Sequence, residues 1–279
     1  MTLAKRAPRN RVRVGISGYV YRGWRGRFYP EDLPARRWLE FASRTFDSIE
    51  LNGTFYSLKT PTVFERWVRE SPDDFVFAVK GSRFITHNLK LRNAAGALAN
   101  FYASGVLALG KKTGPFLWQL PATYSYSRAR VEDFIDLLPR TSRDGEKVAG
   151  GHDSRVRDPL TKAAARVAYR HAFEVRHPSF FCDEFFDLLH EKKCAFVVAD
   201  TAGKFPYAEE VTADFVHVRL HGSTQLYVSG YTDAELDAWA QKIKRWRRSR
   251  DVYVYFDNDA KVNAPFDAIR LSKKLNGGG

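Results

Sequence analysis

The sequence contains little of what marks a secreted or membrane protein. Among its 279 residues there are only two cysteines, Cys182 and Cys194, and they are not arranged as a CxxC pair. This argues against a disulfide framework or a zinc knuckle, and it is typical of proteins in the reducing cytoplasm. No apolar run approaches the roughly 18 residues that cross a membrane, and the basic N-terminus has no apolar stretch for export. We therefore expect a soluble, cytoplasmic protein with no membrane partner.

The common cofactor and nucleophile motifs are also missing. The sequence has no HExxH, no GxSxG, no Walker loop and no GxGxxG after its first predicted strand. We predict no organic cofactor and no resident metal. A divalent metal is kept as an alternative, because carboxylate and imidazole ligands occur at or near predicted strand ends: Glu174, Asp200, His217 and His221. Arg219 and Lys80 are expected to point at the same place, and such cations disfavour the binding of another cation.

Positive charge is in excess, with a formal net charge of +13. Residues 1–13 carry five basic residues and residues 242–250 carry six, and neither segment contains an acid. The remainder of the chain therefore has an excess of only two positive charges. We interpret residues 1–11 as a flexible basic tail and residues 276–279 as a frayed C-terminus. A nucleic-acid partner for this charge is an open alternative to a solvated face.

Eight short runs rich in β-branched and aromatic residues alternate, for the most part, with helical patterns. The runs cover residues 12–17, 48–52, 75–80, 115–120, 171–175, 194–200, 214–220 and 252–258. Apolar residues three and four apart predict helices over 35–46, 62–71, 129–140, 182–193 and 233–246. This alternation predicts one α/β domain, a (β/α)8 TIM barrel over 12–275, with a doubly wound open sheet as the second choice. Residues 141–170 are expected to form an elaborated connection between the fourth helix and the fifth strand.

Polar side chains gather where the predicted strands end. Side chains alternate along a strand, so residues two apart point the same way. Nearly every strand thus delivers an ionisable or amide group to the C-terminal face, where barrel enzymes place their active sites, whereas both basic segments precede strands and belong to the opposite face. We predict five catalytic residues: Glu50, Lys80, Glu174, Asp200 and His221. The alternative is a layer of ion pairs that plugs the barrel, joining Glu50 to Lys80 and Glu174 to Arg176 or Arg219.

Aromatic and basic side chains are interleaved in the loops that follow the strands. The first loop, GYVYRGWRGRFYP at 18–30, is the densest example. Aromatic faces stack on sugars or unpaired bases, and guanidinium groups bind phosphates. These loops and the polar strand ends provide the predicted substrate-binding set: Tyr21, Trp24, Asn52, Phe55, Tyr56, His87, Gln119, Arg176, His177, Arg219, Tyr227, Tyr231 and Asn258. Any single ring could instead pack its loop against the barrel.

Several of these segments resemble one family. The segments GISGYVYRGWRGRFYP, ELNGTFYSLKTP, FVFAVKGSRFITH, FLWQLPATY, FEVRHPSF, VVADTAG, VRLHGSTQLYVSGY and VYVYFDND follow one another as in the YecE-like family, also called domain of unknown function 72. The resemblance covers residues 12–272. It implies a TIM-barrel fold and no established biochemical function. Phe180 departs from the family, in which many members have Trp. A more distant resemblance to the endonuclease-IV and xylose-isomerase barrels implies metal use, but their dense ligand set is not evident here.

These observations lead to one hypothesis and two alternatives. We expect an enzyme that uses acid–base chemistry on a phosphorylated sugar or nucleotide-like ligand, with a small anionic ligand as its partner. Glu174 would be the principal base or acid, Glu50 a second carboxylate and His221 a proton relay, while Lys80, Arg176 and Arg219 would hold anionic oxygens. The alternatives are a nucleic-acid-binding or repair-associated protein and a non-catalytic small-molecule-binding protein. The reaction class and the oligomeric state are left open.

Overall fold

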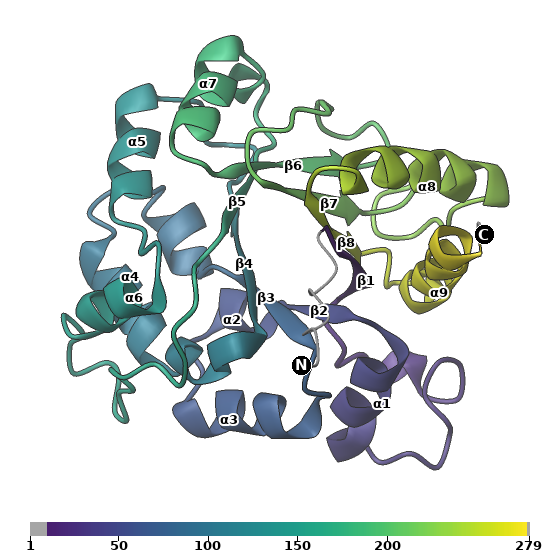
Figure 1. Ribbon diagram of the computed structural model, residues 1–279, viewed down its shortest axis with the longest axis horizontal. Helices are drawn as coiled ribbons and strands as arrows, with labels where there is room; N and C mark the ends of the chain where they lie inside the picture. The colour runs from purple at the N-terminus through teal and green to yellow at the C-terminus, as the bar shows by residue number, and fades with distance from the viewer. Residues whose placement is uncertain (1–9, 278–279) are drawn as a thin grey trace, which may run out of the picture.

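Eight parallel strands pair in the order of the sequence, and β1 also pairs with β8, so the sheet closes into a barrel. Figure 1 shows the strands around the centre with the helices outside them. The predicted TIM barrel is confirmed. The computed structural model describes residues 10–277. Residues 1–9 of the predicted tail and 278–279 of the predicted frayed C-terminus lie outside the described residues.

Each observed strand begins and ends within two residues of a predicted one. The strands are β1 (Val12–Ser17), β2 (Ser48–Leu51), β3 (Val76–Lys80), β4 (Thr113–Gln119), β5 (His171–Glu174), β6 (Ala195–Asp200), β7 (Phe215–Leu220) and β8 (Asp251–Phe256). The α-helices are α1 (Trp38–Thr45), α2 (Gly53–Tyr56), α3 (Pro61–Glu70), α4 (Ala95–Ala103), α5 (Arg128–Asp136), α6 (Ser142–Ala149), α7 (Asp183–Glu191), α8 (Asp233–Arg247) and α9 (Asn263–Asn276). Short 3-10 helices cover Arg22–Trp24, Ala35–Arg37, Val106–Lys112 and Pro178–Phe180, and Phe84–Asn88 is a π-helical turn. Of the helices within residues 10–277, none has the length and apolar character needed to cross a membrane.

Alternation along the strands separates two environments. On β7, Val216, Val218 and Leu220 belong to the large apolar core between the barrel and the helices. The intervening positions point into the barrel, where a second, smaller apolar cluster is formed by Ala78, Leu117, Ala172, Ala195, Val197, Phe215, Tyr253 and Tyr255. Beyond this cluster, toward the C-terminal ends of the strands, the inward positions are polar. The interior of the barrel therefore changes from apolar to charged along its axis, and the charged end forms the candidate site.

The expected connection at 141–170 contains a regular element. Its first part is α6, whose N-terminus is capped by Thr141, because the Thr141 hydroxyl oxygen accepts a hydrogen bond from the Asp144 N–H. α6 packs against α4. Thr141 also bridges to Ala168, just before β5. The connection is thus a helix followed by a return segment, and α2, α4, α6 and α9 are additional to the helices predicted from the sequence.

The basic segment 242–250 lies where the topology requires, in the last turns of α8 and in the turn before β8. That turn is at the N-terminal end of the barrel, away from the polar inward positions at the C-terminal ends of the strands. Lys242 and Arg245 both pair with Glu209. Arg250 instead donates a hydrogen bond to the carbonyl oxygen of Ala213. Two of the six positive charges of this segment are therefore paired with a carboxylate within the fold. Arg250 has no carboxylate partner among residues 10–277.

Close packing between β1 and β2 leaves no room for a side chain at Gly15. A Cβ atom there would overlap the main-chain carbonyl oxygen of Ser48. We expect Gly15→Ala to lower the free energy of unfolding by about 3 kcal/mol or more, the upper end of overpacking costs, because the obstacle is backbone. Gly23→Ala is the matched control, since no atom lies within 4 Å of its added Cβ, and it should change stability by less than about 0.5 kcal/mol. Urea-induced unfolding measures both, and similar losses for the two variants would contradict the prediction.

Candidate functional site

The polar side chains that point inward at the C-terminal ends of the strands are called the polar layer below. One arginine lies at its centre. Arg219, on β7, is fully buried, and its guanidinium donates hydrogen bonds to three carboxylates that lie on or directly after other strands. Nη2 lies 2.8 Å from Glu50 Oε1 and 3.0 Å from Asp257 Oδ2, and Nη1 donates to Glu174 Oε2. Nη2 also donates to Ser17 Oγ at 3.0 Å. Side chains at the ends of β1, β2, β5 and β8 thus surround a single cation.

This pairing keeps the three carboxylates charged. Burial alone would raise the pKa of Glu50, but the charge of Arg219, the hydrogen bond with His217 and the charge of Lys80 together outweigh burial and lower that pKa to about 2. Burial opposes ionisation of Glu174 and Asp257 as well, and Arg219 again lowers the pKa of each below its usual value. Although burial acts against it, the carboxylates raise the pKa of Arg219. At neutral pH the three carboxylates therefore accept hydrogen bonds and hold no proton.

Lys80, at the end of β3, has a different environment. Its side chain is 8% exposed, and its ammonium lies 4.6 Å from the centroid of the Phe55 ring. The Lys80 ammonium makes no hydrogen bond or ion pair with any residue between 10 and 277. Burial, followed by the charge of Arg219, lowers the pKa of Lys80 to about 8. Lys80 can therefore both donate and accept a proton at mildly alkaline pH.

Two buried histidines flank the carboxylates. Nδ1 of His221 lies 3.0 Å from Asp257 Oδ2, and its Nε2 lies 3.7 Å from Glu174 Oε1. Nε2 of His217, two residues earlier in the chain, lies 3.6 Å from Glu50 Oε2. Burial lowers the pKa of His217, so this ring is neutral at neutral pH. The predicted proton relay, His221, is thus in contact with the carboxylates it would serve.

Aromatic side chains after β2 and β3 form part of the rim of the polar layer. Tyr56 and His87 each contact the Phe55 ring edge to face, with centroids 5.1 Å apart in both pairs. Tyr56 is 76% exposed, so this part of the rim faces solvent. Burial, followed by the charge of Lys80, lowers the pKa of His87 to about 4. The imidazole is therefore neutral and retains a hydrogen-bond donor.

Arg176, after β5, connects the buried layer to the rim. Its Nε and Nη2 donate to Glu174 Oε1, and Nη2 also donates to the hydroxyl of Tyr227 at 2.9 Å. Its guanidinium carbon lies 4.8 Å from the centroid of the Phe205 ring. These contacts leave Nη1 of Arg176 without a hydrogen-bond partner among residues 10–277. The Arg176 side chain is therefore fixed in place and still has a donor for a ligand.

Comparison with known proteins agrees with this architecture. A family model described as "Protein of unknown function DUF72" matches residues 13–278. The chain belongs to the DUF72 family. The UPF0759 protein YecE of Escherichia coli strain K12 is 26% identical in an alignment of 253 positions that covers 81% of this chain and 81% of that protein.

Two solved DUF72 structures are also similar. A DUF72 protein of Thermotoga maritima is 26% identical, with a TM-score of 0.77 over 96% of this chain and 100% of that chain. A DUF72 protein of Enterococcus faecalis is 18% identical, with a TM-score of 0.73 over 95% of both chains, a likeness that shows the fold alone. The predicted family is thus confirmed, and membership of this family assigns no activity to the chain.

Many predicted site residues meet in the polar layer of this DUF72 barrel or at its rim. They are Glu50, Lys80, Glu174 and His221, with Asn52, Phe55, Tyr56, His87, Arg176, Arg219 and Tyr227. Gln119 pairs in register with Glu174 on the next strand. The ion pairs considered as an alternative are present in part, because Glu174 pairs with both Arg176 and Arg219. Glu50 pairs with Arg219, and no ion pair joins Glu50 to Lys80. The catalytic and binding roles themselves stay predictions.

Three predicted residues fasten the loop that follows β7. Asp200 Oδ2 accepts a hydrogen bond from the Tyr231 hydroxyl at 3.0 Å. Nδ2 of Asn258 donates to Asp267 Oδ2 on α9 at 2.9 Å, and the Tyr231 N–H donates to the same oxygen. Asp200 and Asn258 are one residue out of phase with the inward positions of β6 and β8. Their contacts favour a structural role over contact with a ligand.

Three more predicted residues have local contacts in the loops after β1 and β5. Trp24 is buried and stacks on Tyr21, with ring centroids 4.6 Å apart. The Tyr21 hydroxyl donates to the carbonyl oxygen of Ser17, below the rim. His177 accepts a hydrogen bond from the Ser179 N–H and so caps the short helix Pro178–Phe180. Of the three, Tyr21 is nearest to the polar layer.

Ser17 and Asp257 belong to the cluster and are absent from the predicted set. The alternation on β8 is the signal for Asp257, which lies two residues beyond the inward-pointing Tyr255. No comparable signal marks Ser17, because a serine at a strand end has many uses. The ligands considered for a metal are not arranged as a site: within residues 10–277, no group of three or more His, Cys, Asp or Glu could hold a metal ion. Arg219 fills the space between Glu50 and Glu174.

Removing the central guanidinium should reverse the pH dependence of stability. In the native protein the pKa of Glu50 falls from 4.5 to about 2, so its stabilising contribution is present above pH 4.5 and lost as the pH falls toward 2. In Arg219→Met, Glu50 and Asp257 lose the guanidinium with which they pair, so burial raises their pKa values above those of the unfolded chain. The variant should therefore gain stability as the pH falls from 7 to 5. At pH 7 we expect it to lose about 3–5 kcal/mol, as measured by urea-induced unfolding.

Arg37→Met provides the control for this experiment. Arg37 pairs with Glu40 on the surface at 2.9 Å. Losing an exposed pair costs less than about 1 kcal/mol. We expect its stability to follow the native pH dependence. If Arg219→Met also followed the native pH dependence, the carboxylates would not depend on Arg219.

Proposed function

We propose that this DUF72 barrel is an enzyme that binds a phosphorylated sugar or nucleotide-like ligand at the C-terminal ends of its strands, and that Lys80 transfers a proton to or from it. One contrast carries the proposal. Each carboxylate of the polar layer forms an ion pair with an arginine. The Lys80 ammonium, in contrast, pairs with no carboxylate within residues 10–277 and has a pKa of about 8. Acid–base groups work best when their pKa lies near the working pH.

Positive charge at the rim supports an anionic ligand. Lys80, Arg83 and Arg176 all lie close enough to His87 to lower its pKa. The nearby carboxylates of Glu50 and Asp257 already form ion pairs with Arg219. An anionic group above the Phe55 ring would therefore meet three cations and one neutral imidazole. Hydrogen bonds between charged groups are about twice as strong as neutral ones, so a phosphate is a suitable guest.

The exposed aromatic side chain beside these cations supports a ligand with a ring. Tyr56 stands next to Phe55 and is open to solvent over most of its surface. Rings of sugars and bases stack on such faces. A phosphate held by Lys80 and Arg176 would place the attached ring near Tyr56. The rim thus combines anion recognition with a stacking surface.

Glu174 is better suited to positioning than to the proton transfer expected from the sequence. Both of its carboxylate oxygens accept hydrogen bonds from arginines, and Arg219 lowers its pKa well below the usual value against the effect of burial. A carboxylate in this state is a poor base near neutral pH. It does fix the guanidinium of Arg176 at the rim. We therefore propose that Lys80 transfers the proton and that Glu174 orients Arg176.

Ligand binding tests the role of Lys80. Isothermal titration calorimetry with glucose 6-phosphate, ribose 5-phosphate and AMP should detect binding of at least one of them, and Lys80→Met should weaken it by about tenfold or more. Affinity in the native protein should fall as the pH rises through about 8, because the ammonium loses its proton. Lys59→Met is the matched control, since Lys59 is only half-buried and its ammonium donates to Ser57 Oγ. Native affinity in Lys80→Met, or no binding of any compound, would contradict the proposal.

The same experiment, continued to turnover, separates an enzyme from a binding protein. Lys80→Arg keeps the positive charge and should keep the ligand, but an arginine does not release its proton near pH 8. Turnover of the bound compound, followed by NMR, should therefore fall by about 100-fold or more in this variant. Lys59→Arg should turn over normally. Tight binding with no turnover by the native protein would support the non-catalytic alternative instead.

A further inference from the structure

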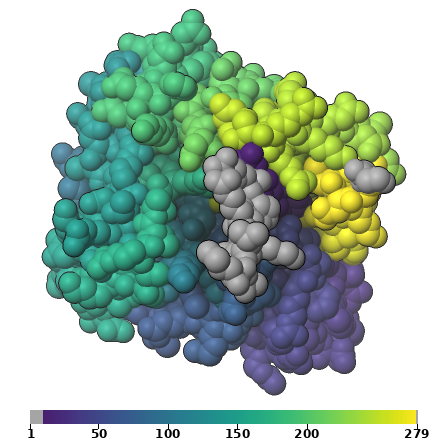
Figure 2. Space-filling model, viewed as in Figure 1, coloured from purple at the N-terminus to yellow at the C-terminus, as the bar shows by residue number. Residues whose placement is uncertain are grey.

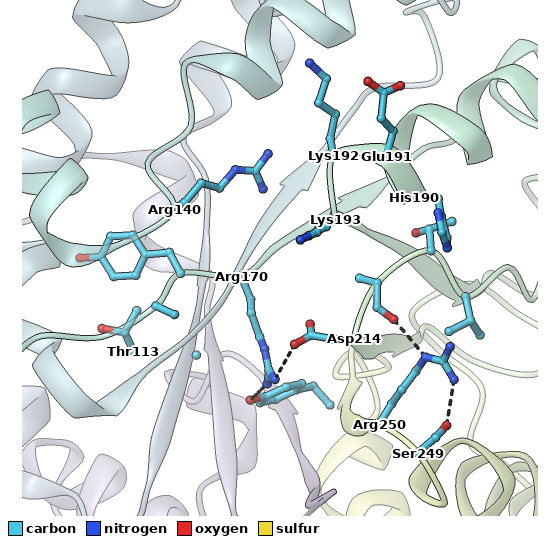
Figure 3. Close-up of a pocket in the computed structure, with 17 residues that line it drawn as sticks. Thr113, Arg140, Arg170, His190, Glu191, Lys192, Lys193, Asp214, Ser249 and Arg250 are labelled. Atoms are coloured by element: carbon cyan, nitrogen blue, oxygen red, sulfur yellow. Dashed lines mark hydrogen bonds and ion pairs between the residues drawn. The ribbon is translucent and has the colours of Figure 1, made fainter.

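A second group of cations surrounds a cavity of about 1230 Å³ at the N-terminal end of the barrel. Its walls include the turns before β5, β6 and β8 (Figure 3). Figure 2 shows a hollow beside the centre of the molecule, bordered by teal and green parts of the chain. The basic side chains of the wall, Arg140, Arg170, Lys192, Lys193 and Arg250, outnumber its acidic side chains, Glu191 and Asp214, by three. This end of a barrel usually serves stability, so an excess of charge there needs a reason.

Two of these cations are used within the fold. Arg170 pairs with Asp251 at 2.7 Å and with Asp214 at 3.3 Å. Lys192 pairs with Asp136 at 2.8 Å. Both side chains therefore join segments of the wall to each other or to neighbouring elements. Their presence is explained by stability.

The other three cations have no acidic partner within residues 10–277. Arg140 donates to Cys194 Sγ at 3.4 Å, a weak acceptor. Arg250 donates to a main-chain carbonyl oxygen at 3.0 Å and to a serine hydroxyl at 2.8 Å. In Figure 3 the ammonium of Lys193 points into the space between Arg140 and Arg170. Three uncompensated charges in one concavity repel each other, which destabilises the empty site.

The backbone at Lys193 adds an independent observation. Lys193 follows α7 with a φ of 53°, in the left-handed region. Glycine or asparagine adopts this conformation at the end of a helix with less strain than lysine does. The chain instead carries a cation at this strained position on the cavity wall. A bound anion would offset both the strain and the charge repulsion.

We propose that this cavity binds a small molecule with two or more phosphate groups, held by Arg140, Lys193 and Arg250. Arginine matches phosphate with paired donors, and lysine adds a mobile point charge. The volume exceeds the roughly 300–1,000 Å³ of most ligand sites, so a molecule the size of a nucleotide fits. The two tyrosines of the wall have little open surface for base stacking, since Tyr169 and Tyr253 are only 7% and 8% exposed. A compact polyanion therefore suits the cavity better than single-stranded nucleic acid does.

Calorimetry with inorganic tripolyphosphate as the probe tests this site. At low salt we expect Lys80→Met, in which the phosphate site proposed at the other end of the barrel is weakened, to bind one ion per chain at this cavity, and the native protein to bind it there with the same affinity. Arg140→Gln/Lys193→Gln should weaken binding by about tenfold or more. Arg36→Gln/Arg69→Gln removes the same charge from exposed positions away from the cavity and should bind as the native protein does. If the cavity pair fails to fold, Lys193→Gln alone, at an exposed side chain, should still weaken binding by about threefold.

Several results would overturn the proposal. One is native affinity in Arg140→Gln/Lys193→Gln, and another is the absence of binding by the native protein. Loss of binding in Lys80→Met would place the anion at the opposite end of the barrel. Tighter binding of a single-stranded oligothymidylate than of tripolyphosphate, weakened by the same pair of substitutions, would assign the cavity to nucleic acid. The proposal stands or falls separately from the function proposed for the polar layer.

Discussion

A guanidinium with no contact to water must be surrounded by acceptors, and in this barrel the strands supply them. Transfer of one charged group from water into a protein interior costs several kcal/mol, which a single ion pair seldom offsets. Arg219 has three carboxylates and a hydroxyl instead, from four different strands or strand ends. Each acceptor has to reach the same point on the barrel axis. The register of the strands and the identity of the inward residues near their ends are therefore constrained together by one side chain.

This constraint determines which groups are left for chemistry. Carboxylates that neutralise an arginine are unavailable as bases near neutral pH, however central their position. Lys80 is excluded from the pairing and lies against an aromatic ring. Burial therefore lowers the pKa of the Lys80 ammonium to mildly alkaline pH, while 8% of the residue remains exposed to solvent. Under the proposed function, the ion pairs considered as a purely structural alternative also keep the carboxylates from pairing with Lys80.

The sequence was sufficient for the barrel because period-two alternation and apolar helical spacing act locally. The same alternation placed Glu50, Lys80, Glu174 and Arg219 on the inward side. It did not establish which partner each charge selects, because those contacts cross the barrel between strands far apart in the chain. Glu50, for example, meets Arg219, 169 residues away, and not the lysine of the adjacent strand.

Other features had weaker signals in the sequence. Asp200 and Asn258 are ionisable or polar strand-end residues like the rest, yet a shift of one position turns them toward the loop after β7. Arg140, Lys193 and Arg250 come from three separate turns, and no sequence motif indicates that they line the same cavity. Convergence of turns is set by helix packing around the barrel. A pattern within one segment does not report it.

The titration of Lys80 is the most direct test of the central claim. The claim is that the carboxylates pair with Arg219, so the Lys80 ammonium has no carboxylate partner and its pKa is lowered. Carbon-13 NMR of protein labelled at the lysine side chains follows each ammonium with pH, and the signal missing from Lys80→Met identifies Lys80. We predict a midpoint near pH 8 for Lys80, well below the roughly 10.4 of exposed lysines. A midpoint shared with the exposed lysines would contradict the claim.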